Sequence, residues 1–141
     1  SEYLSLFEKG EDLIDDNYES VMSAESKALF ASCNISESQL HRIDNSRYIL
    51  NGLADLGVNS IIPIQEGKTP LFIPIYLEDR DKVRKAMFQH NIFCPVHWPI
   101  DGMPVKKGAE LAEHELSLIV DQRYTADDMN RILNILADNI Q

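Results

Sequence analysis

The residues best suited to chemistry in this sequence gather in one stretch, "FCPVHWPI", from Phe93 to Ile100. It holds a histidine, a cysteine, two prolines and the chain's only tryptophan. His97 could donate a hydrogen bond to a substrate or a cofactor, or its ring nitrogens could meet backbone groups in the core. Trp98 could stack on a substrate or line a domain interface, or it could pack beneath the loop that follows. Both residues are therefore candidates for the wall of a functional site.

Arg123 is the side chain most able to bind a carboxylate, because its planar guanidinium offers two parallel donors. Asp121, Asp127 and Asp128 stand close to it in the sequence. Ion pairs between such neighbours are common even where they add little stability. A local ion pair is therefore the favoured interpretation of Arg123, with carboxylate binding as the alternative.

The familiar sequence signatures of catalysis are missing. "EGKT", at residues 66–69, contains Gly-Lys-Thr, but it lacks the upstream glycine of a P-loop and precedes an expected strand instead of a helix. The histidines are scattered, with no His-x-x-x-His or Cys-x-x-Cys spacing for a zinc site. Cys94 and His97 could form a nucleophile pair, but their spacing puts them on opposite faces of an extended strand. We expect Cys94 to be a small buried apolar residue.

Length and charge limit the classes of protein to which the chain can belong. Its 141 residues fit one ordinary domain with a real core. The net charge of -10 would repel nucleic acid and acidic membranes, so neither is expected as a partner. No apolar run approaches the roughly 20 residues of a membrane helix. Two cysteines are too few for a disulfide framework, which favours a reducing, cytoplasmic location.

The helices and strands that must position His97, Trp98 and Arg123 follow an acidic N-terminal segment. Residues 1–22 are expected to form an acidic segment or connector, and residues 23–141 a single domain. Ser23 is suited to cap a short helix whose Leu29 and Phe30 would point inward.

A longer helix is predicted over residues 37–56. Ser36 and Gln39 match a capping box, in which each side chain bonds to the backbone of the other. Apolar residues then recur at helical spacing, and Gly57 can end the helix in a left-handed conformation.

Two further helices are predicted after the middle of the chain. Asp79 can cap the first of them, and Asn91 can end it. Thr125 can cap the second, with Asp128 at its third position. The second carries the cleanest apolar stripe of the chain: Met129, Ile132, Leu133, Leu136 and Ile140.

Four short strands are expected between the helices, at residues 59–64, 70–77, 92–96 and 116–120. Pro74 lies inside the second, which is therefore expected at a sheet edge or with a bulge, because proline lacks an N–H for the ladder. A long loop, residues 99–115, precedes the last strand. Helices that do not strictly alternate with strands favour an α+β fold, with a small, largely antiparallel sheet and helices packed on one face.

Residues from His97 onward carry a family resemblance. "FCPVHWP", a variable loop, "LSLIVDQRY" and the capped helix that follows together resemble the C-terminal end of DegT-like aminotransferases, which are fold-type I enzymes that use pyridoxal phosphate (PLP). "PLFIPIYLEDRDKVRKAMFQHNI" resembles the strand and helix before this motif. "SAESKALFASCN", leading into the helix with Arg47 and Tyr48, resembles the helix that links the large domain of these enzymes to the small one. The resemblance covers residues 23–141.

The resemblance implies that the chain is a small domain, which closes over an active site built mainly by a large domain. It implies a place near substrate or cofactor for His97, Trp98 and Arg123, although the sugar-specific members do not depend on one arginine here. PLP catalysis needs a Schiff-base lysine, and none of the chain's seven lysines stands in the family's lysine context, which lies upstream of the matched region. We therefore expect PLP in the parent protein, and neither PLP nor transamination on this chain alone.

Partners and alternatives follow from this interpretation. The resemblance implies the large PLP-binding domain of the same parent as the main partner, and a nucleotide-sugar ketone or a related compound as the substrate. The surface left by the missing domain could also bring two copies together as a homodimer. The alternative is a stand-alone module of the same fold that binds a ligand or a protein without catalysis. A metal hydrolase built on the scattered histidines is the remaining hypothesis.

Overall fold

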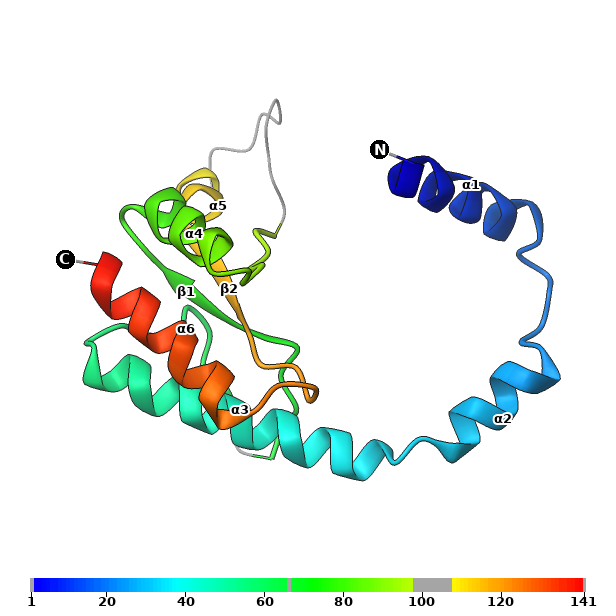
Figure 1. The fold of residues 1–141 in the computed structure, drawn as a ribbon, viewed down its shortest axis with the longest axis horizontal. Helices are drawn as coiled ribbons and strands as arrows, with labels where there is room; N and C mark the ends of the chain where they lie inside the picture. The colour runs from blue at the N-terminus through cyan, green and yellow to red at the C-terminus, as the bar shows by residue number, and fades with distance from the viewer. Residues whose placement is uncertain (1, 66, 98–107, 141) are drawn as a thin grey trace. The chain divides into compact units, whose positions relative to one another are not determined.

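The chain divides into two units in the computed structural model, which describes residues 2–65, 67–97 and 108–140 (Figure 1). Unit 1 comprises Ser1–Asn34 and unit 2 comprises Ile35–Gln141. His97 and Arg123, two of the predicted site residues, belong to unit 2.

Unit 1 contains two exposed helices, α1 (Glu2–Asp16) and α2 (Ala24–Ser32). The backbone N–H of Ser26 donates to Oγ of Ser23 at 3.1 Å, which confirms the predicted cap of α2. The expected inward packing of Leu29 and Phe30 is wrong, because both side chains are exposed. Neither helix buries a residue, so the described part of unit 1 has no core of its own.

Unit 2 is built on one small sheet. Its strands β1 (Phe72–Tyr76) and β2 (Glu115–Ile119) pair antiparallel, with Ile73 opposite Leu118 and Ile75 opposite Leu116. The helices of this unit are α3 (Ile35–Asp55), α4 (Arg80–Gln89), α5 (Ala109–His114) and α6 (Ala126–Asn139). Over the described residues the chain therefore has six helices and a two-stranded antiparallel sheet, and the predicted α+β class is confirmed.

The core lies on one face of this sheet. Ile73 and Ile75 of β1 share that face with Leu116 and Leu118 of β2, and all four are fully buried. Helices α3, α4 and α6 supply most of the remaining core residues: Ile49, Leu53, Val83, Met87, Met129, Ile132, Leu133 and Leu136. Burial of each such side chain contributes about 1.5–3 kcal/mol of transfer free energy. Because side chains alternate along a strand, the remaining residues of both strands occupy the opposite face.

Residues 59–64 do not form the expected strand. They make one isolated bridge to β1, and the N–H of Ile61 donates to the carbonyl of Pro74 at 2.9 Å. Pro63 has no N–H with which to continue the pairing. Pro74 itself turns its carbonyl away from β2, so its missing N–H removes no bond between the two strands. Its predicted place on an edge strand is confirmed.

Residues 92–96 are also not a strand, although they run beside β2. The backbone N–H of Ser117 donates to the carbonyl of Pro95 at 3.2 Å. Pro95 cannot return a bond, because it has no N–H, and the ladder is not completed. This short contact nevertheless places the next residues of the segment, up to His97, beside the edge of β2 that does not pair with β1.

Helix α3 differs from its prediction at its start. It begins at Ile35, so Ser36 lies inside the first turn and the predicted capping box is wrong. Leu40, which was expected on the apolar stripe, is exposed. The buried face comprises Asn45, Ser46, Ile49 and Leu53. Gly57 has a φ of 70°, which confirms the predicted left-handed residue after the helix.

The two later helices agree with their predicted caps. The N–H of Lys82 donates to the Asp79 carboxylate at 3.2 Å, and Asn91, just past the end of α4, has a φ of 59°. Thr125 and Asp128 form the capping box at the start of α6. The predicted stripe of α6 is buried apart from its last residue, which is partly buried.

The long loop before β2 differs from its prediction at its C-terminal end. Residues 109–114 form α5, a short helix that leads directly into β2. Residues 98–107, which include Trp98, lie outside the described part of the chain. None of the described helices has the length and apolar character needed to cross a bilayer.

Candidate functional site

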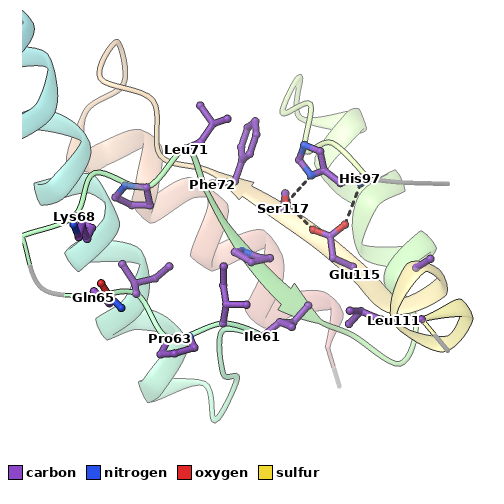
Figure 2. A pocket seen from close by; sticks show the side chains of 16 residues that line it. Ile61, Pro63, Gln65, Lys68, Leu71, Phe72, His97, Leu111, Glu115 and Ser117 are labelled. Atoms are coloured by element: carbon purple, nitrogen blue, oxygen red, sulfur yellow. Dashed lines mark hydrogen bonds between the residues drawn. The ribbon is translucent and has the colours of Figure 1, made fainter. Parts of the chain in front are cut away.

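An apolar groove of about 850 Å³ lies on the sheet face opposite the core (Figure 2). Phe72 and Pro74 of β1 line it, together with Ile61 and Pro63 from the segment before β1 and Leu111 from α5. Figure 2 shows a polar cluster at one end of the groove. The helices that form the core, α3, α4 and α6, pack on the other face of the sheet, so among the described residues they do not fill this groove.

Three residues form the polar cluster: His97, Ser117 and Glu115. The Nδ1 atom of His97 lies 2.9 Å from Oγ of Ser117, and the Ser117 hydroxyl donates to Oε1 of Glu115 at 2.6 Å (Figure 2). The backbone N–H of His97 donates to the other carboxylate oxygen, Oε2, at 3.1 Å. Glu115 and Ser117 are buried, and His97 is half-buried. One buried carboxylate thus holds the backbone of His97 directly and its ring through Ser117.

Phe72 packs against the ring of His97. The two ring centroids are 4.8 Å apart, with an angle of 47° between the planes. A contact of this kind adds about 0.5–1.5 kcal/mol beyond the area it buries. The imidazole is therefore held by a ring contact and by a hydrogen bond through Nδ1, and it lines the groove.

The three residues do not have the arrangement of a hydrolytic triad. In such a triad the serine donates to the histidine, which in turn donates to the acid. Here Ser117 lies between the two others and donates directly to Glu115. Ser117 is also only 3% exposed. The cluster orients His97 and does not activate a nucleophile.

The described lining of the groove does not fit PLP. PLP enzymes supply a lysine, an acid on the pyridine nitrogen and several donors to the phosphate. Lys68 lines the groove away from the His97 end (Figure 2), and Glu115 is already engaged by Ser117 and His97. Most of the other described lining residues are apolar. No step of PLP chemistry can be assigned to these residues.

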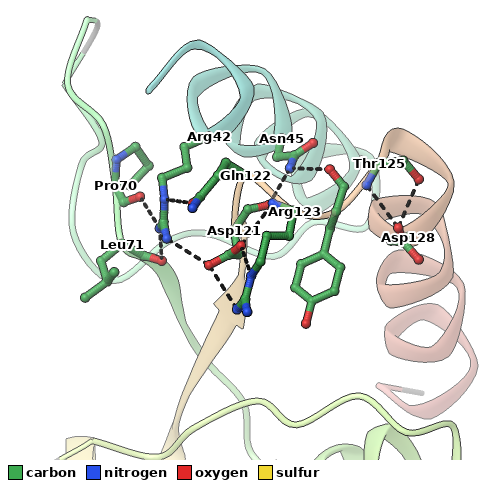
Figure 3. A network of polar contacts seen from close by, with 10 residues as sticks. Arg42, Asn45, Pro70, Leu71, Asp121, Gln122, Arg123, Thr125 and Asp128 are labelled. Carbon is green, nitrogen blue, oxygen red and sulfur yellow. Dashed lines mark hydrogen bonds and ion pairs between the residues drawn. The ribbon is translucent and has the colours of Figure 1, made fainter. Parts of the chain in front are cut away.

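Arg123 pairs with Asp121, as the favoured interpretation of the sequence predicted (Figure 3). Its Nε donates to Oδ1 of Asp121 at 2.7 Å, and its backbone N–H donates to the same oxygen at 3.0 Å. The hydrogen bond and positive charge of Arg123 hold the pKa of the Asp121 carboxyl below its ordinary value, and Asp121 raises the pKa of Arg123. Arg123 is exposed and does not line the groove. The structure does not bring it together with His97.

Arg42 on α3 fixes the loop that carries Arg123. Its Nη2 atom donates to Oδ2 of Asp121 at 2.9 Å, and its Nε donates to Gln122 at 2.6 Å (Figure 3). Its Nη1 donates to the carbonyl of Leu71, at the start of the sheet, at 3.3 Å. Asn45, one turn along α3, donates to the Asp121 carbonyl at 2.9 Å. The helix is thereby fastened to the segment before β1 and to the segment after β2.

Neither the described cysteines nor the described carboxylates and histidines add another site. Cys94 is buried, and burial raises the pKa of its thiol to about 11, which confirms its expected apolar role. Cys33 is exposed. No group of three or more metal-ligating side chains comes together among the described residues.

Sequence reasoning found His97 but missed the residues that hold it. A signal was present in "ELSLI", where Glu115 and Ser117 alternate with two leucines. The leucines face the core, so the two polar residues must share the opposite face of the strand. Their pairing with His97 depends on the contact between residues 92–96 and β2, which the sequence pattern did not reveal. Arg42 was missed because nothing local distinguishes it from a solvated helix residue.

Comparisons with known proteins identify no relative. No protein-family profile, no curated protein and no solved structure matches the chain.

Proposed function

We propose that this chain is the C-terminal small domain of a PLP-dependent, DegT-like aminotransferase-family protein. It closes over an active site supplied by a large domain that is absent from the chain, and it does not catalyse transamination alone. The observation that carries the proposal is the open sheet face, where His97 is held at one end of an apolar groove. The resemblance of the surrounding residues to the DegT-like family gives this face its proposed partner.

The open face has the character of a surface that another domain covers. Exposed apolar side chains from three segments border the groove: Ile62, Leu71 and Leu111. Contiguous apolar surface of this kind marks a site of interaction. The large domain of the same parent protein is the proposed partner, and it would bury these side chains when the lid closes.

The two stretches that carry the resemblance meet at this face. "FCPVH" lies beside "LSLIV" through the bond from Ser117 to Pro95, and the cluster of His97, Ser117 and Glu115 spans both. "DQRY" follows β2 directly and is fastened by Arg42. Residues far apart in the sequence are thus close where a shared site would require it, which supports a common functional role.

His97 has the leading role in the proposed site. Its ring lines the groove and is oriented by Ser117 and Phe72, so it can meet a substrate or cofactor held by the large domain. Trp98 and Arg123 keep their proposed places near substrate or cofactor, although Arg123 is engaged by Asp121 in this structure. PLP would supply the electron sink for the reaction in the parent protein, on a lysine of the large domain. The proposed substrate is a nucleotide-sugar ketone or a related compound, and the proposed compartment is the cytoplasm.

The parent protein provides the test of this proposal. Its reading frame should encode several hundred residues upstream, with a lysine-bearing large domain, and the purified parent should absorb as a PLP–lysine adduct. The purified chain mixed with PLP should show no such absorbance. A parent that starts within a few residues of Ser1, or a chain that turns over an amino donor by itself, would sink the proposal.

A substitution in the parent tests the role of His97. Loss of a hydrogen bond to the reacting complex should lower kcat/KM roughly 10-fold or more in His97→Gln, because about 1.4 kcal/mol corresponds to a factor of ten. His90→Gln is the matched control, since His90 is exposed at the end of α4 and does not line the groove. Equal kinetics for the two variants would remove His97 from the site.

The size of the groove favours one alternative, a stand-alone ligand-binding module. Its volume of about 850 Å³ falls within the roughly 300–1,000 Å³ of ordinary small-molecule sites. This alternative predicts a complete short gene and binding without catalysis. Light-scattering mass measurements at several concentrations distinguish a monomer from a homodimer that covers the open face.

A further inference from the structure

Helix α1 carries an apolar face that no other described part of unit 1 covers. Its large apolar side chains recur at steps of three, four or seven residues, which places them on one side of a helix. They are between 54% and 71% exposed, and the ring centroids of Tyr3 and Phe7 lie 6.4 Å apart. Such a face stabilises a helix mainly through what packs on it. We call these residues the apolar stripe of α1: Tyr3, Leu6, Phe7, Leu13 and Ile14.

The opposite face of α1 is acidic. The helix holds six carboxylates and one lysine, Lys9. Glu2 lies one turn before Leu6, and Glu11 lies one turn after Phe7, so carboxylates border the apolar stripe on both of its long sides. Among the described residues, none of the six carboxylates belongs to an ion pair. A partner that packs on the apolar stripe therefore meets negative charge along both edges.

The shape of the apolar stripe fits another helix. Apolar residues at alternating steps of three and four form the narrow line along which two helices pack side by side. Gly10 lies in the middle of the apolar stripe, and no atom stands within 4 Å of the place that its Cβ would take. Because glycine has no side chain, a second helix can approach α1 closely at this point.

The charge of the chain determines the sign of the partner. Unit 1 has eight carboxylates and two lysines, so it supplies -6 of the net charge of -10, and unit 2 supplies the remaining -4. A second copy would therefore bring negative charge to a negative helix. Anionic membranes would do the same, and helices that lie on membranes are rich in lysine and arginine, whereas α1 has only Lys9. Lysines and arginines on a separate protein complement the borders of the apolar stripe.

We propose that the apolar stripe of α1 docks on a basic amphipathic helix of a separate protein. The two apolar faces pack together, and the lysines and arginines that border the partner's face meet the carboxylates that border the apolar stripe. The inference does not depend on the proposed function, because it rests on α1 and not on the groove of unit 2.

A synthetic peptide provides the probe, and the full chain is its receptor. The lysine peptide is an amphipathic helix with leucine at the a and d positions of each heptad and lysine at the flanking e and g positions. The glutamate peptide has glutamate in place of every lysine. In fluorescence anisotropy titrations the lysine peptide should bind, and binding should weaken as salt screens the charges. The glutamate peptide should not bind. Failure of the lysine peptide to bind, or equal binding of both peptides, overturns the proposal.

Two leucines of α1 give a matched comparison. Leu6 belongs to the apolar stripe and Leu4 lies on the acidic side, yet the two are almost equally exposed, at 61% and 63%. Leu6→Ala should weaken binding of the lysine peptide roughly 10-fold or more, because the burial of a leucine is lost. Leu4→Ala should leave binding unchanged. Alanine preserves the helix, and Leu13→Ala should repeat the result of Leu6→Ala further along the apolar stripe. Equal effects at Leu4 and Leu6 would indicate unspecific attraction between charges and would refute the docking.

Other occupants of the apolar stripe would give different results, and each of these contradicts the proposal. A dimer in light scattering that Leu6→Ala dissociates would assign the apolar stripe to a second copy. Binding to uncharged phosphatidylcholine vesicles that Leu6→Ala abolishes would assign it to a lipid surface. A shift of urea unfolding by Leu6→Ala and not by Leu4→Ala would mean that the chain covers the apolar stripe itself. A parent protein that no longer binds the lysine peptide would mean that the parent covers it.

Discussion

Arg42 on α3 and Asp121 after β2 are 79 positions apart in the chain, and their charged groups lie 2.9 Å from each other. Each side chain is only 17% exposed, so the pair is screened less than a surface salt bridge. Arg42 also bonds to Gln122 and to the carbonyl of Leu71. This one side chain therefore ties the helix to both strands at one end of the two-stranded ladder, where Phe72 pairs with Ile119.

Replacing Arg42 by methionine should destabilise the chain by about 1–3 kcal/mol, because Asp121 and three further acceptors would lose a partly buried donor. Urea unfolding followed by circular dichroism measures the change. Arg47→Met is the matched control on the same helix, since its pair with Asp44 is largely exposed and such pairs contribute about 0–1 kcal/mol. Equal effects of the two substitutions would show that Arg42 has no special structural role.

The ion pair of Asp121 should make the unfolding free energy of the chain fall at acidic pH. An unfolded aspartate binds a proton near pH 3.9, whereas the hydrogen bond and charge of Arg123 lower the pKa of Asp121 in the folded chain. Between the folded and the unfolded pKa of Asp121, the unfolded state therefore binds more protons than the folded state. The contribution of Asp121 to the unfolding free energy is lost as pH falls through the folded pKa.

The test of this pH dependence is urea unfolding at steps between about pH 5 and pH 2. Asp121→Asn should give a smaller loss of unfolding free energy over that interval than the unmodified chain. Asp128→Asn should remove a second part of the dependence, because the backbone N–H and hydroxyl of Thr125 lower the pKa of Asp128. An unchanged slope in both variants would contradict these assignments.

The two thiols should differ sharply in reactivity. A pKa of about 11 leaves roughly one part in a thousand of Cys94 as thiolate at pH 8, and its side chain is buried as well. Cys33 is exposed. Ellman's reagent should therefore label Cys33 quickly in the native chain and Cys94 only after unfolding. Cys33→Ser should abolish the fast phase, and a fast phase that survives it would mean that Cys94 is accessible.

Gly52 should resist substitution even though it lies in a helix. A Cβ atom at this position of α3 would overlap the side chain of Leu133 on α6. Alanine favours a helix over glycine by about 1 kcal/mol, but overpacking a core contact costs about 1–3 kcal/mol. We expect Gly52→Ala to lower the unfolding free energy by up to about 2 kcal/mol, the difference between these two effects.

Gly10→Ala is the control for that substitution. Gly10 lies in α1, and nothing approaches its hypothetical Cβ atom, so only the helix preference of alanine should act. Circular dichroism should show equal or greater helicity for Gly10→Ala. A Gly52→Ala variant that is more stable than the unmodified chain would show that α3 and α6 are not in close contact at this point.

The sequence predicted those elements whose signals are local. Asp79, Asn91 and the capping box of Thr125 and Asp128 bond within their own helix ends, so their positions could be inferred from neighbouring residues alone. The helix formed by residues 109–114 was missed inside the long loop, because the six residues carry no N-cap side chain. Local chemistry defines helix ends, but it does not determine which extended segments pair.

Pairing and burial were harder to predict because they depend on distant residues. The segments at residues 59–64 and 92–96 have strand-like composition, yet Pro63 and Pro95 deny them a complete ladder. Leu29 and Phe30 are large apolar residues and were therefore expected to point inward, but no described element of unit 1 packs over them and both are exposed. His97 was found by its residue type, whereas the roles of Ser117 and Glu115 became visible only when residues 20 and 18 positions away lay beside it.

Reductive trapping of PLP on the full-length parent protein, followed by peptide mapping, tests most directly whether this chain is a lid over a cofactor held elsewhere. The label should appear on a lysine encoded upstream of Ser1 and on none of the seven lysines of this chain. A label on Lys68 in the groove or on another lysine of the chain, or a parent that takes up no PLP, would contradict the proposed function.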